Sequence, residues 1–146
     1  MVHITTVCLV LLGSAMNQKA EALKARTASF AKTVIEICER DVDASQVSKI
    51  MKGQLISAAT SVAINYRSAC RARSRPEFIA KIGVVREEAD ESQGWLELLV
   101  ETGKLKKEQA EAAIAEADEL TAIFNSSYVT AREGVSVISC VKRIDG

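Results

Sequence analysis

Apolar residues recur at steps of three and four from Met16 onward, which is the spacing of one buried face on an α-helix. The first helix is expected over roughly residues 16–40, ending at the charged run Glu39-Arg40-Asp41. Its predicted buried face consists of Met16, Ala20, Leu23, Thr27, Phe30, Val34 and Ile37.

A second helix is expected from about Ser45 to Arg71, with Asp43 or Ser45 as its N-terminal cap. Its predicted buried face consists of Val47, Met51, Leu55, Ala58, Val62, Tyr66 and Ala69. Asn65 lies beside this face and has two interpretations. It is a buried polar residue that fixes the register of the bundle, or it lines a ligand cleft. The first is favoured because no other polar group converges on it in the sequence.

The third helix has the clearest start and stop signals of the chain. Ser74 can cap it, Glu77 can complete a capping box, and Pro76 is tolerated in the first turn. Gly103 is a typical residue to follow its C-terminus. Its predicted buried face consists of Phe78, Ile82, Val85, Ala89, Ser92, Leu96 and Leu99.

A fourth helix begins near Lys106 and ends at Gly134. Its predicted buried face consists of Ala110, Ala113, Ala117, Leu120 and Phe124. Four amphipathic helices of similar length joined by short turns predict an all-α, up-down-up-down four-helix bundle. Packing the four apolar faces together removes all of them from water at once.

The two ends of the chain fit this pattern less well. Residues 1–15 form an apolar extension that we expect to lie outside the fold, with the bundle over 16–133 and a C-terminal tail over 134–146. The run Val7–Leu12 resembles part of a signal peptide, but no Lys or Arg precedes it, and it is too short to span a bilayer. We therefore predict no membrane association, and we expect the tail to be extended or disordered.

Composition narrows the class of protein further. Hydrophobic residues make up 48% of the chain and aromatic residues only 4%, which favours helices over a β-sandwich. The formal net charge is +0, so nucleic acid would have to bind at a local patch. The four cysteines are widely spaced, and His3 is the only histidine. This pattern predicts no zinc site and suits a reducing cytoplasm.

One stretch of the chain is strongly basic. Between residues 67 and 86 six basic residues accompany a single acidic one, Glu77. The six are Arg67, Arg71, Arg73, Arg75, Lys81 and Arg86. An acidic block, residues 87–97, follows directly. Two interpretations stay open: the basic residues contact phosphates of RNA or DNA, or they pair with acidic residues between helices or protomers. The second is favoured because charge runs usually form solvated or paired faces.

Catalytic and cofactor chemistry finds little support in these residues. A di-iron bundle needs Glu-x-x-His motifs on two helices, but His3 lies outside the expected bundle. The scarcity of histidine also argues against Ser-His or Cys-His catalysis. The chain has no GxxxxGK[ST] phosphate loop. We predict no catalytic residues, metal, cofactor or small-molecule ligand, and hence no enzyme.

A family resemblance emerges from residues 20–130. It is carried by Gln54-Leu55, the Ala- and Ser-rich turns to Val62, Asn65, Ser74-x-x-x-Phe78, Glu87-Glu88-x-x-Glu91 and Trp95-Leu96-Glu97. In these features the chain resembles the four-helix bundle family first noticed in reading frames within 23S rRNA intervening sequences. In most of the family this Asn is followed by a small or acidic pair of residues and then Gly. In this chain Asn65 is followed by Tyr66-Arg67-Ser68-Ala69, which suggests a variant branch.

The resemblance implies a left-handed bundle that assembles as a homopentamer. The family is also similar to the accessory variability determinant protein of diversity-generating retroelements, a basic pentamer that engages RNA and a reverse transcriptase. This chain is neutral and does not reproduce that basic character. The expected function is therefore a non-enzymatic, self-assembling scaffold. The alternative is a nucleic-acid-binding accessory protein, with a reverse transcriptase as a further partner.

Overall fold

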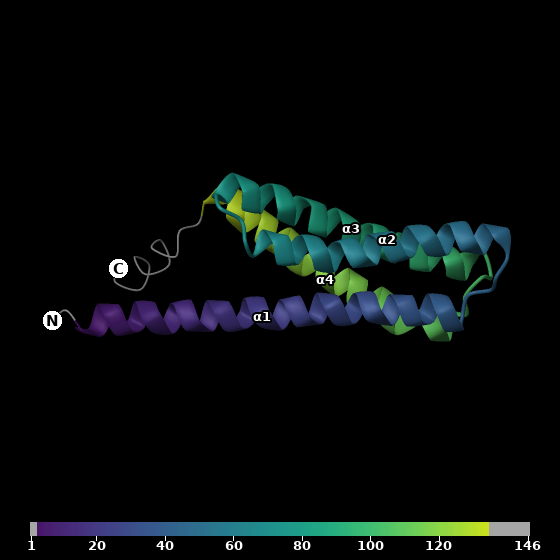
Figure 1. Cartoon of the computed structure of the whole chain (residues 1–146), viewed down its shortest axis with the longest axis horizontal. Helices are drawn as coiled ribbons and strands as arrows, with labels where there is room; N and C mark the ends of the chain where they lie inside the picture. The colour runs from purple at the N-terminus through teal and green to yellow at the C-terminus, as the bar shows by residue number, and fades with distance from the viewer. Residues whose placement is uncertain (1–2, 135–146) are drawn as a thin grey trace.

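Four helices form an antiparallel bundle in a computed structural model that describes the backbone of residues 3–134 and the side chains of residues 13–134. The helices are α1 (His3–Arg40), α2 (Gln46–Ala69), α3 (Arg75–Glu101) and α4 (Lys107–Glu133). The chain reverses direction at each short turn, and α1 is much the longest helix (Figure 1). The predicted all-α four-helix bundle is thus confirmed.

Local side-chain chemistry fixes where the helices begin and end. The Ser45 hydroxyl accepts the backbone N–H of Ser48 at 3.3 Å, and the Ser74 hydroxyl accepts that of Glu77 at 3.2 Å, as expected for N-terminal caps. Gly103 follows α3 with φ 68°, a left-handed conformation in which a Cβ would be strained. Both predicted caps and this predicted helix end are confirmed.

The predicted capping box at the start of α3 differs in one detail. The Glu77 carboxylate accepts the backbone N–H of Arg73 at 2.9 Å, one residue before the cap, and not that of Ser74. The bond places a negative charge in the first turn of α3, where it also faces the positive end of the helix dipole. It lowers the pKa of Glu77, chiefly through this backbone bond.

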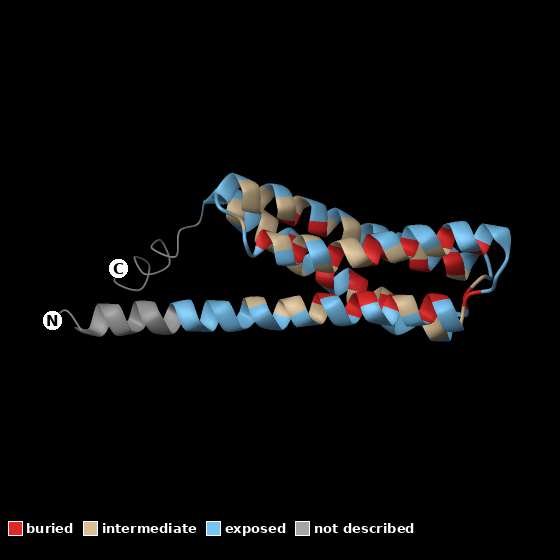
Figure 2. Cartoon of the chain, in the orientation of Figure 1, coloured by how far each residue is buried: buried red, intermediate tan, exposed pale blue. Residues whose placement is uncertain are grey.

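The predicted apolar faces meet in a continuous core along the bundle axis (Figure 2). Its largest fully buried members are Phe124, Leu55, Ile82, Leu96, Leu99 and Leu120. Each contributes roughly 1.5–3 kcal/mol on leaving water. Tyr66 of α2 packs on Phe124 of α4, with ring centroids 5.1 Å apart, so this tyrosine is a core residue.

Two residues predicted to be buried are exposed, and three more, Ala20, Leu23 and Phe78, are half-buried. Met16 is 62% exposed, because among the side chains described from residue 13 onward the first buried one in α1 is Thr27. Val47 is 57% exposed, and Ser48 takes the buried position in its place. The Ser48 hydroxyl lies 3.0 Å from that of Ser45, so the cap turns a serine inward at this end of α2.

Helix α1 begins at His3, well before the expected start at Met16. Residues 13–19 are all exposed (Figure 2). The boundary between an N-terminal extension and the bundle therefore stays a prediction. Except for Gly134, the predicted tail lies outside the described residues.

Polar contacts hold α1 to α4. Arg26 of α1 donates through Nε and Nη2 to the two carboxylate oxygens of Glu116 of α4, at 2.6 and 2.7 Å. At the other end of the bundle, the Gln109 amide donates to Asp41 at 2.9 Å. These contacts anchor α1 at two levels, so the groove it forms with α2 has a defined shape.

Candidate interaction surface

Arg67 and Arg71 lie on the groove between α1 and α2. Both side chains are exposed, and neither has a carboxylate partner among the described residues. The groove measures about 510 Å³. Its other lining residues are Glu21, Lys24, Ala25, Ala28, Ala63 and Ile64. Lys24 is paired with Glu21, so the two arginines are the unpaired charges of this groove.

Arg73 and Arg75 serve the local structure of the turn between α2 and α3. Arg73 Nε lies 3.4 Å from the carboxylate of Glu77, which also accepts the Arg73 backbone N–H. Arg75 donates to the carbonyl oxygens of Ala131 at 2.7 Å and Arg132 at 3.0 Å, at the C-terminus of α4. This guanidinium satisfies carbonyls that have no partner within their own helix.

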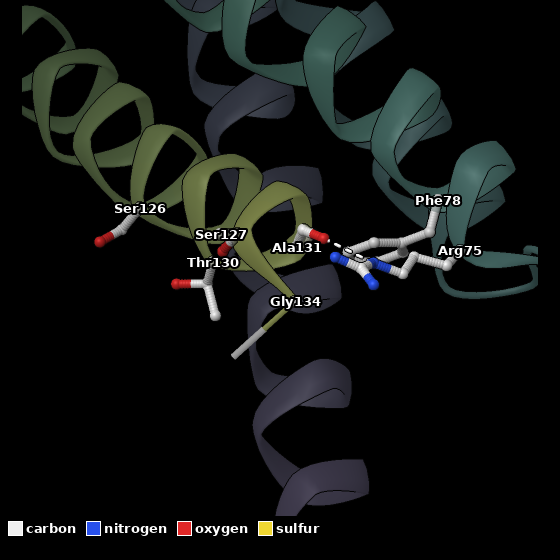
Figure 3. Close-up of a pocket in the computed structure, with 7 residues that line it drawn as sticks. All are labelled: Arg75, Phe78, Ser126, Ser127, Thr130, Ala131 and Gly134. Atoms are coloured by element: carbon white, nitrogen blue, oxygen red, sulfur yellow. Dashed lines mark hydrogen bonds between the residues drawn. The ribbon is translucent and has the colours of Figure 1, made fainter. Parts of the chain in front are cut away.

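The groove around Arg75 measures about 600 Å³ and is drawn in Figure 3. Phe78 lies beside Arg75 on α3, while Ser126, Ser127 and Thr130 line the groove from α4. Because the guanidinium is already bonded to backbone carbonyls, it is poorly placed to hold an anion there.

Arg86 crosses from α3 to α4. Its guanidinium lies 4.4 Å from the centroid of the Tyr128 ring and donates to the Asn125 side chain at 3.3 Å. Its pairing with the adjacent Glu87 is long, at 3.8 Å. Lys81 is half-buried on the same helix.

The six basic residues therefore do not share a single solvent-facing patch. Arg67 and Arg71 lie on the α1–α2 groove, Arg73 lies in the turn after α2, and Lys81 is half-buried on α3. Arg75 and Arg86, both on α3, contact α4. Pairing with the acidic block occurs within the chain only between Arg86 and Glu87, among the residues described. Arg67 and Arg71 therefore differ from the other arginines of the basic stretch, because they are exposed and have no carboxylate partner among the described residues.

Asn65 is half-buried, and its amide donates to the backbone oxygen of Ser61 at 3.0 Å. This bond stays within α2 and reaches no other helix. The role of Asn65 in setting the register stays a prediction, and no described contact connects it to a ligand cleft.

Sequence reasoning overlooked a stripe on the outer side of α2 in which every residue except the half-buried Thr60 is exposed. Its residues recur at steps of three and four, and we call them the α2 stripe: Ile50, Gly53, Ser57, Thr60 and Ile64. Ile50 is 59% and Ile64 is 66% exposed. A signal was present in the sequence, because the stretch from Gly53 to Tyr66 contains no charged residue on any side of the helix.

An apolar groove of about 430 Å³ runs beside the α2 stripe and continues the groove that holds Arg67 and Arg71. It is lined by Ala28, Ala31, Lys32, Ile35, Glu36, Thr60, Ala63 and Ile64. The small side chains leave room for another helix to approach closely. The surface thus combines an apolar floor with a basic end.

The described residues hold no group of three His, Cys, Asp or Glu side chains placed to bind a metal ion. Within residues 3–134, no helix is long and apolar enough to cross a membrane. Of the cysteines whose surroundings are described, Cys38 is buried, Cys70 is exposed, and both are free.

The chain is similar to known proteins in sequence and fold. A search of curated proteins gave no match. A similar solved structure is a protein of unknown function from the S23 ribosomal protein family of Bacteroides thetaiotaomicron VPI-5482. It is 28% identical with a TM-score of 0.64, and the match covers 72% of this chain and 96% of the other. The family model for the 23S rRNA-intervening sequence protein matches residues 19–126, and the chain therefore belongs to that family.

Proposed function

We propose that this protein is a non-enzymatic scaffold that assembles from copies of itself. The single observation that carries the proposal is the uncharged, partly apolar α2 stripe on the outside of the bundle. The family resemblance supports a finer form of the proposal, a left-handed bundle assembled as a homopentamer. A neutral chain suits such assembly, since no net charge drives the copies apart.

The α2 stripe lies opposite the buried face of its own helix. A surface helix ordinarily carries charged and polar residues there. Instead, two isoleucines flank small residues over four turns of helix, beside an apolar groove. Apolar surface gathered in this way marks a contact site more often than scattered exposed residues do. No neighbouring atom lies within 4 Å of the position that a Cβ on Gly53 would occupy, so a second helix can approach the backbone there.

The test is the mass of the protein in solution, measured by light scattering coupled to size exclusion. We expect a discrete oligomer, with a mass of five chains for the finer form of the proposal. Ile64→Lys should dissociate it, because a charge would be buried in the contact. Val129→Lys on α4, which changes an exposed apolar residue outside the α2 stripe, is the matched control. A monomeric wild-type protein would overturn the proposal.

A second candidate function is binding of RNA or DNA, with a reverse transcriptase as a further partner. One observation favours it: Arg67 and Arg71 are exposed and unpaired among the described residues. Binding measured by fluorescence anisotropy should weaken as salt rises, and Arg67→Glu/Arg71→Glu should abolish it. Lys107→Glu, an exposed residue on α4, is the control. Absence of binding at low salt would exclude this function.

A further inference from the structure

A second exposed stripe lies on the outer side of α3. Its residues also recur at steps of three and four, and we call them the α3 stripe: Ala80, Val84, Glu87, Glu91, Gly94 and Leu98. Val84 is 39% and Leu98 is 40% exposed. No atom lies within 4 Å of a Cβ built on Gly94, so the surface is open there. The stripe combines apolar and small residues with two carboxylates.

Two arginines follow the uncharged α2 stripe at the same spacing at which two glutamates occur in the α3 stripe. On the α2 side, Ile64 is followed at three and seven positions by Arg67 and Arg71. On the α3 side, Val84 is followed at three and seven positions by Glu87 and Glu91. If the two helices ran in the same direction with Ile64 of one copy opposite Val84 of the other, Thr60 would face Ala80 and Arg67 would face Glu87. Arg71 follows the end of α2 at Ala69 and would come level with Glu91, whereas Ile50 and Leu98 lie outside the overlap of the two helices.

These charged groups are largely free within one chain. Arg67 and Arg71 have no carboxylate partner among the described residues, and the side chain of Glu87 is 72% exposed with only Arg86 at 3.8 Å. Glu91 accepts one bond from the Trp95 indole at 3.2 Å through Oε1. The guanidinium groups and carboxylates can therefore form new pairs without breaking a strong one.

We infer that the N-terminal half of the α3 stripe of one copy packs against the C-terminal half of the α2 stripe of a second copy, with Arg67 and Arg71 facing Glu87 and Glu91. This inference rests on the proposed self-assembly and names the surfaces that would carry it. The two faces are different, so a copy that offers one still has the other free. Such a contact can repeat from copy to copy and close into a ring.

The apolar residues and the charges have different tasks in this contact. Ion pairs at the edge of an interface each contribute little to affinity. Like charges brought face to face are strongly unfavourable, so the arginines and glutamates select which helix faces which. Charge reversal is therefore the sharpest test.

The experiment uses three full-length variants and a control, studied by light scattering at low salt. Arg67→Glu/Arg71→Glu and Glu87→Lys/Glu91→Lys should each weaken assembly at least tenfold. The variant that combines all four changes should restore the oligomer, because the charges are exchanged and still complementary. The matched control is Lys107→Glu/Glu111→Lys on α4, two exposed residues outside both stripes. It should assemble like the wild type.

Mixing gives an independent result. Equal amounts of the two double variants should associate with each other, since both faces of one are acidic and both faces of the other are basic. The two variants must then alternate, so a closed ring of five would keep one contact between like variants. Helical content and thermal unfolding, followed by circular dichroism, establish that every variant is folded. A double variant that does not fold is replaced by its single changes, Arg71→Glu and Glu91→Lys.

The outcomes separate this inference from the proposed function. A monomeric wild-type protein would overturn both. An oligomeric wild type whose double variants assemble as well as the control would overturn the pairing of the stripes and leave self-assembly standing. Failure of the folded fourfold variant to assemble, with both doubles dissociated, would also overturn the pairing.

Discussion

Cys38 shows how burial of one side chain makes stability depend on pH. It is 1% exposed in the core, and burial raises the pKa of its thiol to about 11. In the unfolded chain the thiol ionises near pH 8.5. The folded state therefore holds the proton more tightly, and the stabilisation is complete below about pH 8.5 and lost as pH rises toward 11.

The free energy of unfolding should accordingly fall by about 2 kcal/mol between pH 8.5 and 11 because of this thiol. Urea denaturation at a series of pH values measures the fall. In Cys38→Ala the free energy of unfolding should fall less steeply with pH over this range. Cys70→Ala, which removes an exposed thiol, is the control and should keep the wild-type slope. Equal slopes in all three proteins would contradict the prediction.

Arg75 illustrates a charged residue whose task is structural. Its bonds to the carbonyls of Ala131 and Arg132 place a positive charge at the negative end of α4. Arg75→Ala should lower the free energy of unfolding by about 1 kcal/mol. Urea denaturation tests this, with Arg73→Ala as the control because its side chain is exposed and its backbone bond to Glu77 survives. A larger loss in the control would contradict the assignment.

At the scale of the elements, Arg26 joins α1 to α4 where α1 begins to pack against the bundle. Its hydrogen bonds to Glu116, with a further one to Glu119, raise the pKa of the guanidinium. Because the pair is about one-third exposed, Arg26→Ala should cost only about 0.5–1 kcal/mol.

The effect of Arg26→Ala should be local. Amide hydrogen exchange should become faster in α1 around residues 21–30, while α3 keeps its protection. Lys32→Ala, which removes an exposed pair with Glu36 within α1, is the control. Uniform loss of protection from amide exchange over all four helices would show that the Arg26–Glu116 pair supports the whole bundle and not α1 alone.

Helix positions followed from the sequence because periodicity and caps report on local physics. Ser45, Ser74 and Gly103 act through neighbours a few residues away, so their roles could be predicted. Met16 could not be placed correctly in the same way. Its apolar spacing continues that of the buried face, but burial depends on how far the partner helices extend, which is a property of the assembled bundle.

At the scale of the whole molecule, the candidate surface was harder to predict than the core. The cluster of arginines in the sequence suggested one patch, yet the turn between α2 and α3 sends Arg75 to α4 and leaves Arg67 beside α1. Nearness along the chain does not determine which face a residue occupies after a turn. The uncharged stretch from Gly53 to Tyr66 was a signal of the α2 stripe in the sequence, but the exposure of Ile50 and Ile64 depends on the packed bundle.

At the scale of the whole molecule, the N-terminal part of α1 is exposed where its side chains are first described. Residues 13–19 are exposed, and from residue 13 onward the first buried residue of the helix is Thr27. A shortened chain that lacks residues 1–15 keeps every described core residue and the hydrogen bonds between Arg26 and Glu116. Its free energy of unfolding should therefore stay within about 0.5 kcal/mol of that of the full chain.

Urea denaturation of both proteins, at equal protein concentration, measures this difference. Chain concentration must match because association with other copies would itself add to the apparent stability. A shortened chain of unchanged stability would support a bundle that starts near residue 16. A loss well above 1 kcal/mol, with the oligomer intact, would show that the first fifteen residues belong to the fold. If the oligomer dissociated while each chain stayed folded, the extension would be part of the contact between copies.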